Sequence, residues 1–157
     1  MCFILDEGHR HCLMLCRRRE PHKGQWNAPG GKVREGETPA QACRREIREE
    51  TGLDLEDLRP MGSVDCLDLG DPANAWRLYL FLGCHPRVPV AAREEGHFAW
   101  LDLGAVLAGG REFVHNIPFI LPPLLRGLAI RGVFEYRDNF LERYYISLNT
   151  ESRGLPI

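Results

Sequence analysis

Apolar and polar positions alternate along several short stretches of the chain, a pattern typical of strands with one buried face. Two such stretches flank the turn-rich segment DEGHR and predict a hairpin, and two more flank the turn GDPAN. A last hairpin is predicted to turn at Asp138-Asn139. The stretches with this pattern are residues 2–5, 11–18, 58–69, 75–86 and, as one hairpin, 132–148.

The best-marked helix lies between residues 38 and 52. Thr38 suits the N-cap, Pro39 the first helical position, and Gln41 the third position of a capping box. Gly52 is the expected residue just past the C-terminus.

Two further helices and one short strand are predicted with weaker signals. Residues 97–103 lead into a short helix that ends at 108–110, and residues 116–130 hold a helix that begins near its prolines. The loop before residue 38 is expected to form a short strand near Lys32 and Val33. Helices that interrupt a hairpin-built sheet indicate an α/β fold with a mixed sheet and helices on its faces, rather than a doubly wound parallel sheet.

Composition narrows the class of protein. A chain of 157 residues, 44% apolar and 27% charged, suits one domain over residues 1–157. The net charge of −2 gives no strong field toward nucleic acid or membrane, and the longest apolar runs are too short to span a bilayer. The N-terminus lacks the basic and apolar regions of a signal peptide, so we expect a cytoplasmic protein.

Six cysteines are present, and none forms a C-x-x-C pair. Cys12 and Cys16 stand four residues apart on a predicted strand, which separates their Cα atoms by about 13 Å. That separation is too large for a disulfide. We therefore expect reduced thiols packed as small apolar groups, as is usual in the cytoplasm.

The candidate chemistry lies on the helix at 38–52. Glu46, Glu49 and Glu50 fall within about one and a half turns and share an arc of the helical wheel with small and apolar residues. Carboxylates that face the protein body are costly unless positive charge neutralises them. Arg45 can pair with Glu49 at i,i+4, but one arginine does not balance three carboxylates. A divalent cation would, and oxygen ligands suit Mg²⁺ or Mn²⁺.

The three glutamates belong to a longer pattern that begins at Gly31. Gly31, five residues, Glu37, seven residues and then REIREETGL match G-x5-E-x7-R-E-U-x-E-E-x-G-U, with U aliphatic, at every constrained position. This pattern is the Nudix box, and the chain resembles the Nudix hydrolases over nearly its whole length. Outside the box it is most similar to the MutT-type group that hydrolyses oxidised purine nucleotides such as 8-oxo-dGTP.

The resemblance implies a Nudix fold, an α/β/α sandwich with a mixed central β-sheet and the box as loop-helix-loop. It also implies that Arg45 orients a glutamate through a charge-assisted hydrogen bond, and that Glu37 contacts Arg45 or the N-terminal end of the helix. The implied metal ligands, direct or through water, are the Gly31 carbonyl, Glu46, Glu49 and Glu50.

The implied reaction is metal-assisted hydrolysis of a pyrophosphate link, in which bound cations screen charge and a carboxylate accepts a proton from water. In relatives the base is either a box glutamate or an acid in a loop before a tryptophan. Glu95, five residues before Trp100, is the candidate here and Glu94 the weaker one. An exposed loop acid without a catalytic role is the open alternative for Glu95.

Several residues outside the box are candidate substrate contacts. Asn27 takes the place of an asparagine that contacts the base in the MutT-type group, and an amide can both donate and accept. Lys23 and Lys32 can approach phosphates. His115 and Asn116 stand where the best-matching relatives carry two aspartates, so base recognition through protonated acids is lost here. The aromatic candidates for stacking on a base, for which core packing is the commoner role, are Phe113, Phe119 and Trp76.

The sequence thus indicates a metal-dependent pyrophosphohydrolase that converts an oxidised purine nucleoside triphosphate into the monophosphate and pyrophosphate. ADP-ribose, another nucleoside diphosphate derivative, a dinucleoside polyphosphate or a capped RNA end are alternative substrates, and a non-catalytic nucleotide-binding module is an alternative class. The expected partner is a small nucleotide, with no polymeric nucleic acid and no membrane. The expected assembly is a monomer or a homodimer.

Overall fold

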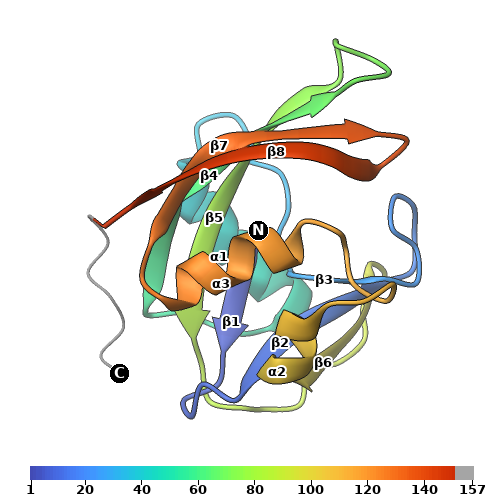
Figure 1. Ribbon diagram of the computed structural model, residues 1–157. Helices are drawn as coiled ribbons and strands as arrows, with labels where there is room; N and C mark the ends of the chain where they lie inside the picture. Colours follow the sequence, from blue (N-terminus) through green and yellow to red (C-terminus); the bar gives the residue numbers. More distant parts are fainter. Residues whose placement is uncertain (151–157) are drawn as a thin grey trace.

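The computed structural model describes residues 1–150. Strands dominate it, with one long helix and two short ones (Figure 1). In chain order the elements are β1 (Cys2–Leu5), β2 (His11–Arg17), β3 (Trp26–Asn27), α1 (Pro39–Thr51), β4 (Leu58–Asp68), β5 (Ala75–Cys84), β6 (Gly96–Asp102), α2 (Leu103–Ala108), α3 (Ile117–Leu125), β7 (Ala129–Arg137) and β8 (Phe140–Asn149).

The strands form one mixed sheet in the order β3-β2-β1-β5-β4-β7-β8, with β6 paired to β2. Hairpin neighbours are antiparallel, whereas β1 pairs parallel with β5 and β4 pairs parallel with β7. Each parallel pair joins strands that are distant in the chain, as a crossover connection requires. The predicted mixed sheet is confirmed.

The two faces of the sheet carry separate apolar layers. Along β1, Phe3 and Leu5 belong to the layer beneath α2 and α3, and Cys2 and Ile4 belong to the layer beneath α1. This alternation follows from the two-residue period of a strand. Figure 1 shows α3 in front of the sheet and α1 behind it, so the α/β/α sandwich is confirmed.

Helix α1 begins and ends where the sequence predicts. The Thr38 hydroxyl accepts a hydrogen bond from the Gln41 N–H at 3.2 Å, and the Gln41 side chain accepts one from the Thr38 N–H at 2.8 Å. Gly52 ends the helix in the left-handed region at φ 76°, where a Cβ would be strained. An N-cap of this kind contributes about 1 kcal/mol, which fixes the register of the three glutamates on the helix.

The prediction of a short strand near Lys32 and Val33 is wrong. The short strand in this loop is β3, at Trp26–Asn27. It pairs with Leu15 and Cys16 of β2 through contacts that local sequence does not encode. The β7–β8 turn lies at Asp138 and Asn139 as predicted, both with positive φ.

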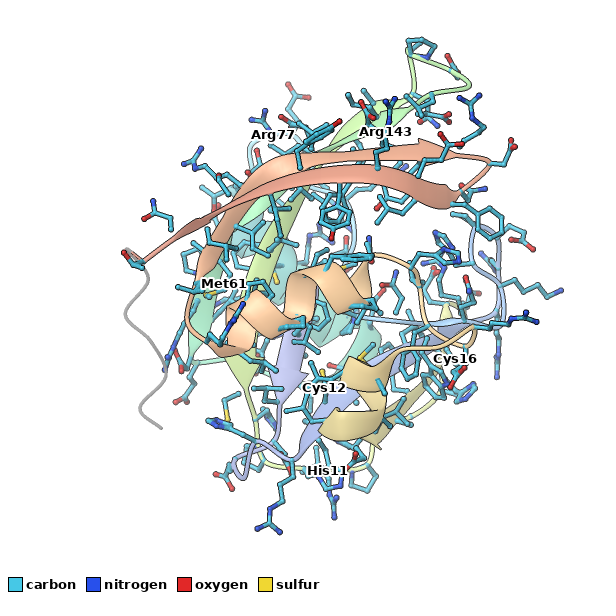
Figure 2. All side chains as sticks on the ribbon, in the orientation of Figure 1. His11, Cys12, Cys16, Met61, Arg77 and Arg143 are labelled. Carbon is cyan, nitrogen blue, oxygen red and sulfur yellow. The ribbon has the colours of Figure 1, made fainter. Side chains whose placement is uncertain are left out.

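All six cysteines are free thiols, as predicted. Cys12 and Cys16 lie apart along β2 (Figure 2). Within residues 1–150, no helix combines the length and the apolar character needed to cross a membrane.

Candidate active site

The loop before α1 and the first half of α1 meet at Gly31 and Glu46. A Cβ placed on Gly31 would overlap the carboxyl group of Glu46, so only glycine leaves room for this carboxylate. The Gly31 backbone has no positive φ, and the requirement is therefore for space and not for backbone freedom. The glycine brings its backbone against the acidic face of the helix.

Arg45 ties the loop and the helix together. Its Nε and Nη2 bind the two oxygens of Glu37 at 2.6 and 3.0 Å, and its Nη1 binds Glu46 at 2.7 Å and Glu49 at 3.1 Å. Its Nη2 also donates to the Lys32 carbonyl at 3.0 Å. The predicted contacts of Arg45 with Glu37 and with Glu49 are confirmed. A planar guanidinium with five donors can make this set of bonds, and a lysine cannot.

The charges in this network reinforce one another. Hydrogen bonds from the Arg45 guanidinium, helped by the Arg34 N–H, lower the pKa of Glu37 to about 2. The carboxylates of Glu37 and Glu46 in turn raise the pKa of Arg45. Glu49 is half-exposed and also lies 3.4 Å from an Arg34 nitrogen. Glu37 is therefore held as an anion, and Glu49 is paired with both Arg45 and Arg34.

Glu50 differs from its neighbours because none of the ion pairs among residues 1–150 includes it, although the charge of Arg17 acts to lower its pKa. Burial, followed by the charges of Glu46 and Glu95, raises the pKa of Glu50 to about 7, although a hydrogen bond from the Gly30 backbone opposes the rise. Its Oε2 is buried and finds no hydrogen-bond partner among the described residues. A buried carboxylate oxygen without a partner beside a second acid is an arrangement that a cation would stabilise.

Glu95 lies close enough to Glu50 for its charge to contribute to that raised pKa. It is half-buried in the segment before β6, and its carbonyl accepts a hydrogen bond from the Arg18 N–H at 2.9 Å. Glu94 points elsewhere, because its exposed carboxylate lies 3.7 Å from an Arg19 nitrogen. The structure therefore brings Glu95 toward the acidic helix and leaves Glu94 on the surface.

The residues fit a magnesium or manganese ion, although they do not form a closed cage. Within residues 1–150, no three His, Cys, Asp or Glu side chains are arranged as a complete metal-binding cluster. Magnesium commonly takes only one or two carboxylates and fills its other positions with water and substrate phosphates. The free oxygen of Glu50 with Glu46 beside it provides such a donor set.

Two neighbouring cavities share Met1, Trp76 and Leu78, and the larger one is also lined by residues of α1. One, of about 430 Å³, is bordered by Gly31 and Lys32. The other, of about 320 Å³, opens between the sheet and the N-terminal end of α3. Its polar lining, which is rich in amides, consists of His22, Asn27, Asn74, Asn116, Tyr136 and Asn139.

The predicted substrate contacts are distributed unevenly over these cavities. Asn27 and Asn116 both line the smaller cavity, which we call the amide cavity, and Lys32 borders the larger one. Lys23 lies on the exposed loop before β3, outside both cavities. Trp76 lines both cavities and stacks on Tyr136 with ring centroids 5.6 Å apart.

The other two aromatic candidates pack elsewhere. Phe113 is buried in the core, and Phe119 packs against Tyr144 of β8 with ring centroids 4.3 Å apart.

Sequence reasoning missed Tyr136 and Cys66, which line the amide cavity beside Asn116. The Tyr136 hydroxyl accepts a hydrogen bond there from Asn116 at 3.1 Å. The available signal is the alternation in GVFEY, which places Tyr136 on the same face of β7 as the buried Phe134. The contact with Asn116, twenty residues away, has no local signature.

The structure thus combines a mixed α/β/α sandwich with a capped acidic helix that one arginine ties to its preceding loop. The family model for the NUDIX domain matches residues 1–117. The chain belongs to the Nudix family, whose enzymes bind nucleotide substrates.

Named relatives agree with this assignment. The chain is 28% identical over 126 residues to an oxidized purine nucleoside triphosphate hydrolase from mouse (Mus musculus), covering 80% of this chain and 79% of the relative. It is 38% identical over 98 residues to a putative 8-oxo-dGTP diphosphatase 2 from Mycobacterium tuberculosis, covering 59% of this chain and 66% of the relative. A crystal structure of a MutT protein from Bacillus halodurans superposes with a TM-score of 0.76 at 27% identity, covering 93% and 94% of the two chains.

Proposed function

We propose that the chain is a divalent-metal-dependent pyrophosphohydrolase that converts an oxidised purine nucleoside triphosphate, such as 8-oxo-dGTP, into the monophosphate and pyrophosphate. The observation that carries the proposal is the buried, unpartnered oxygen of Glu50 beside Glu46. Gly31, which packs against the Glu46 carboxyl group, also borders the larger of the two neighbouring cavities. The names of the relatives support the substrate class.

In this proposal the cations are Mg²⁺ or Mn²⁺, held by Glu46, Glu49, Glu50 and the Gly31 carbonyl, directly or through water. When bound, they would screen the polyphosphate and make water a better nucleophile. Arg45 holds the carboxylates of Glu46 and Glu49 in place through hydrogen bonds. Glu50 or Glu95 takes the proton of the attacking water, since both lie where a base is needed and neither is bonded to Arg45.

The two cavities support binding of a nucleotide across them. The wall at Gly31 and Lys32 suits the phosphates, because it offers backbone and a cation. The amide cavity suits a purine base, because Trp76 gives an aromatic face and Asn27 and Asn116 give hydrogen-bonding edges. Lys23, on its exposed loop, is proposed to reach a phosphate only when substrate is present. Six free thiols support a reducing compartment, and we infer the cytoplasm.

A substrate panel tests the proposal. With Mg²⁺ and then Mn²⁺, kcat/KM is measured for 8-oxo-dGTP, dGTP, dATP, ADP-ribose and a dinucleoside polyphosphate, with pyrophosphate detected directly. We expect pyrophosphate from the purine triphosphates, the highest kcat/KM with 8-oxo-dGTP, and no turnover in chelator. A preference for ADP-ribose with release of nucleoside monophosphate would overturn the substrate, and binding without turnover would overturn catalysis.

Glu50→Gln provides the matched variant. Replacing one carboxylate oxygen with an amide keeps the volume and removes the charge, so we expect a loss of roughly 10²- to 10⁴-fold in kcat without unfolding. Glu35→Gln is the control, because Glu35 is an exposed residue of the loop before α1. Full activity in Glu50→Gln would contradict the proposal.

A further inference from the structure

Three side chains from distant parts of the chain form a polar contact chain at the wall of the amide cavity. The Nδ2 of Asn116 donates to the Tyr136 hydroxyl at 3.1 Å, and the thiol of Cys66 lies beside that hydroxyl. All three residues are buried, with exposed fractions of 6%, 6% and 1% in that order. Polar groups buried this deeply are expected to have defined partners and a defined orientation.

The hydrogen bond to Tyr136 fixes which end of the Asn116 amide is left without a partner. The Tyr136 oxygen accepts from the Asn116 amide nitrogen, which is a donor only. The Nδ2 of Asn116 is thereby engaged, and its Oδ1 is left. This oxygen is buried and lacks a hydrogen-bond partner in the part of the chain that the structure describes.

The side chain of Asn116 does not make the helix-capping hydrogen bond that its position allows. It is the N-cap residue of α3, where asparagine is among the preferred residues, yet its side chain caps no backbone N–H of the helix. The side chain turns instead to Tyr136, on β7, at the point where the β7–β8 register shifts. A bulge of this kind re-aims a strand side chain.

Asn27 presents the complementary end of its own amide to the same cavity. Its Oδ1 accepts from the Ala28 N–H at 2.9 Å, which leaves the Nδ2 donor for a ligand. At the amide cavity, Asn116 therefore offers an acceptor and Asn27 a donor. Neither group changes charge with pH.

We propose that Tyr136 is a positioning residue that holds the Asn116 carbonyl oxygen toward the ligand, so that the amide cavity selects a neutral base edge carrying an N–H donor beside an acceptor. This inference rests on the proposed function, because it assumes that the base of a nucleotide enters the amide cavity. Tyr136 acts through Asn116 and not by touching the reacting phosphates.

A double-mutant cycle tests whether Tyr136 acts through Asn116. Wild type, Tyr136→Phe, Asn116→Leu and the double variant are compared for binding of 8-oxo-dGMP and dGMP by calorimetry without metal. The same four proteins are compared for kcat and KM with the corresponding triphosphates. Tyr145→Phe is the matched control, because Tyr145 is 62% exposed on β8.

Loss of one hydrogen bond corresponds to about 3- to 10-fold in affinity, so we expect Tyr136→Phe to weaken binding and raise KM by that factor with kcat unchanged. Asn116→Leu should weaken binding by about 10-fold or more, because it removes the acceptor itself. In the Asn116→Leu background, Tyr136→Phe should cause no further loss of affinity and no further rise in KM. Additive effects, or a Tyr136→Phe loss in kcat alone, would overturn the proposal.

Failure of this inference can be told apart from failure of the proposed function. Nucleotide binding and turnover without coupling between the two sites would overturn only the role of Tyr136. Absence of binding and turnover with every nucleotide would overturn both. If Tyr136→Phe does not fold, Cys66→Val replaces it in the cycle. Removing the thiol beside the Tyr136 hydroxyl should weaken nucleotide binding less than Tyr136→Phe would, and this loss should still depend on Asn116.

Discussion

Gly31 lies so close to Glu46 that a Cβ on the glycine would overlap the carboxyl group of the glutamate. The glycine belongs to the loop and the glutamate to α1, fifteen residues later in the chain. The first constrained position of the Nudix box is thus explained by a steric relationship to an acid of the same box.

We predict that Gly31→Ala displaces the Glu46 carboxylate and lowers kcat/KM by about 100-fold, the size of effect that a 1 Å misplacement can cause. The fold should persist, because the Gly31 backbone has an ordinary φ and the residue is exposed. Steady-state kinetics and a thermal melt measure the two effects. In the control, Gly8→Ala, the nearest neighbour of the new Cβ lies 4.0 Å away, so activity should be unchanged. A fully active Gly31→Ala would contradict the steric account.

The local features of α1 could be predicted from sequence because they depend on neighbours in the chain. Thr38 and Gln41 are three residues apart, and Arg45 and Glu49 are four apart, so helical geometry alone brings each pair together. The same periodicity correctly turned Glu46 and Glu50 toward the protein body, but it was wrong for Glu49, whose side chain is half-exposed and pairs with Arg34 and Arg45.

What the sequence did not reveal depends on long-range pairing. Val33 has strand propensity, but the strand formed at Trp26–Asn27, where β2 offers a partner. The partner of Asn116 is Tyr136, brought near by the parallel pairing of β4 with β7 and by the packing of α3 on the sheet. The closeness of Glu95 to Glu50 likewise depends on the pairing of β6 with β2.

The second prediction concerns the pH dependence of stability in metal-free protein. The pKa of Glu50 is about 7 in the folded protein, against an ordinary value of 4.5, chiefly because of burial. Between these values the folded state binds more protons than the unfolded state, so the Glu50 contribution to stability falls as pH rises from about 4.5 and levels off above about 7.

Chemical unfolding of wild type and Glu50→Gln at pH 5 to 8, in chelator, measures this contribution. Because the amide does not titrate, we expect the variant to gain stability relative to wild type as pH rises, with the gain levelling off above about pH 7. Glu37 does not confound the comparison, since its lowered pKa of about 2 confines its contribution to more acidic pH. Added Mg²⁺ should stabilise wild type at pH 8 more than the variant. Parallel pH profiles for the two proteins would refute the prediction.

The third prediction concerns Arg45. Arg45→Ala removes the group that holds Glu37, Glu46 and the Lys32 carbonyl together, so we expect kcat/KM to fall by about 100-fold. Arg45→Lys should fall between this variant and wild type, because it keeps the charge but cannot bind several carboxylates in one plane. Arg48→Ala is the control, since Arg48 is exposed and pairs with Asp54 away from the acidic face. If Arg45→Lys matches wild type, charge alone is sufficient and the geometric account is wrong.

The final prediction distinguishes two adjacent acids, Glu95 and Glu94. Glu95 acts electrostatically on Glu50, whereas Glu94 is exposed and pairs with Arg19, an interaction that contributes little. We expect Glu95→Gln to lower kcat by about 10- to 100-fold if it takes or relays the proton of water, and Glu94→Gln to leave kcat within about 2-fold of wild type.

Profiles of kcat against pH decide how Glu95 acts. If Glu95 only raises the pKa of Glu50, its removal should shift the acidic limb to lower pH and leave the plateau intact. If Glu95 is the base, the plateau itself should fall. Equal effects of the two substitutions would remove Glu95 from the catalytic machinery and leave Glu50 as the remaining candidate base.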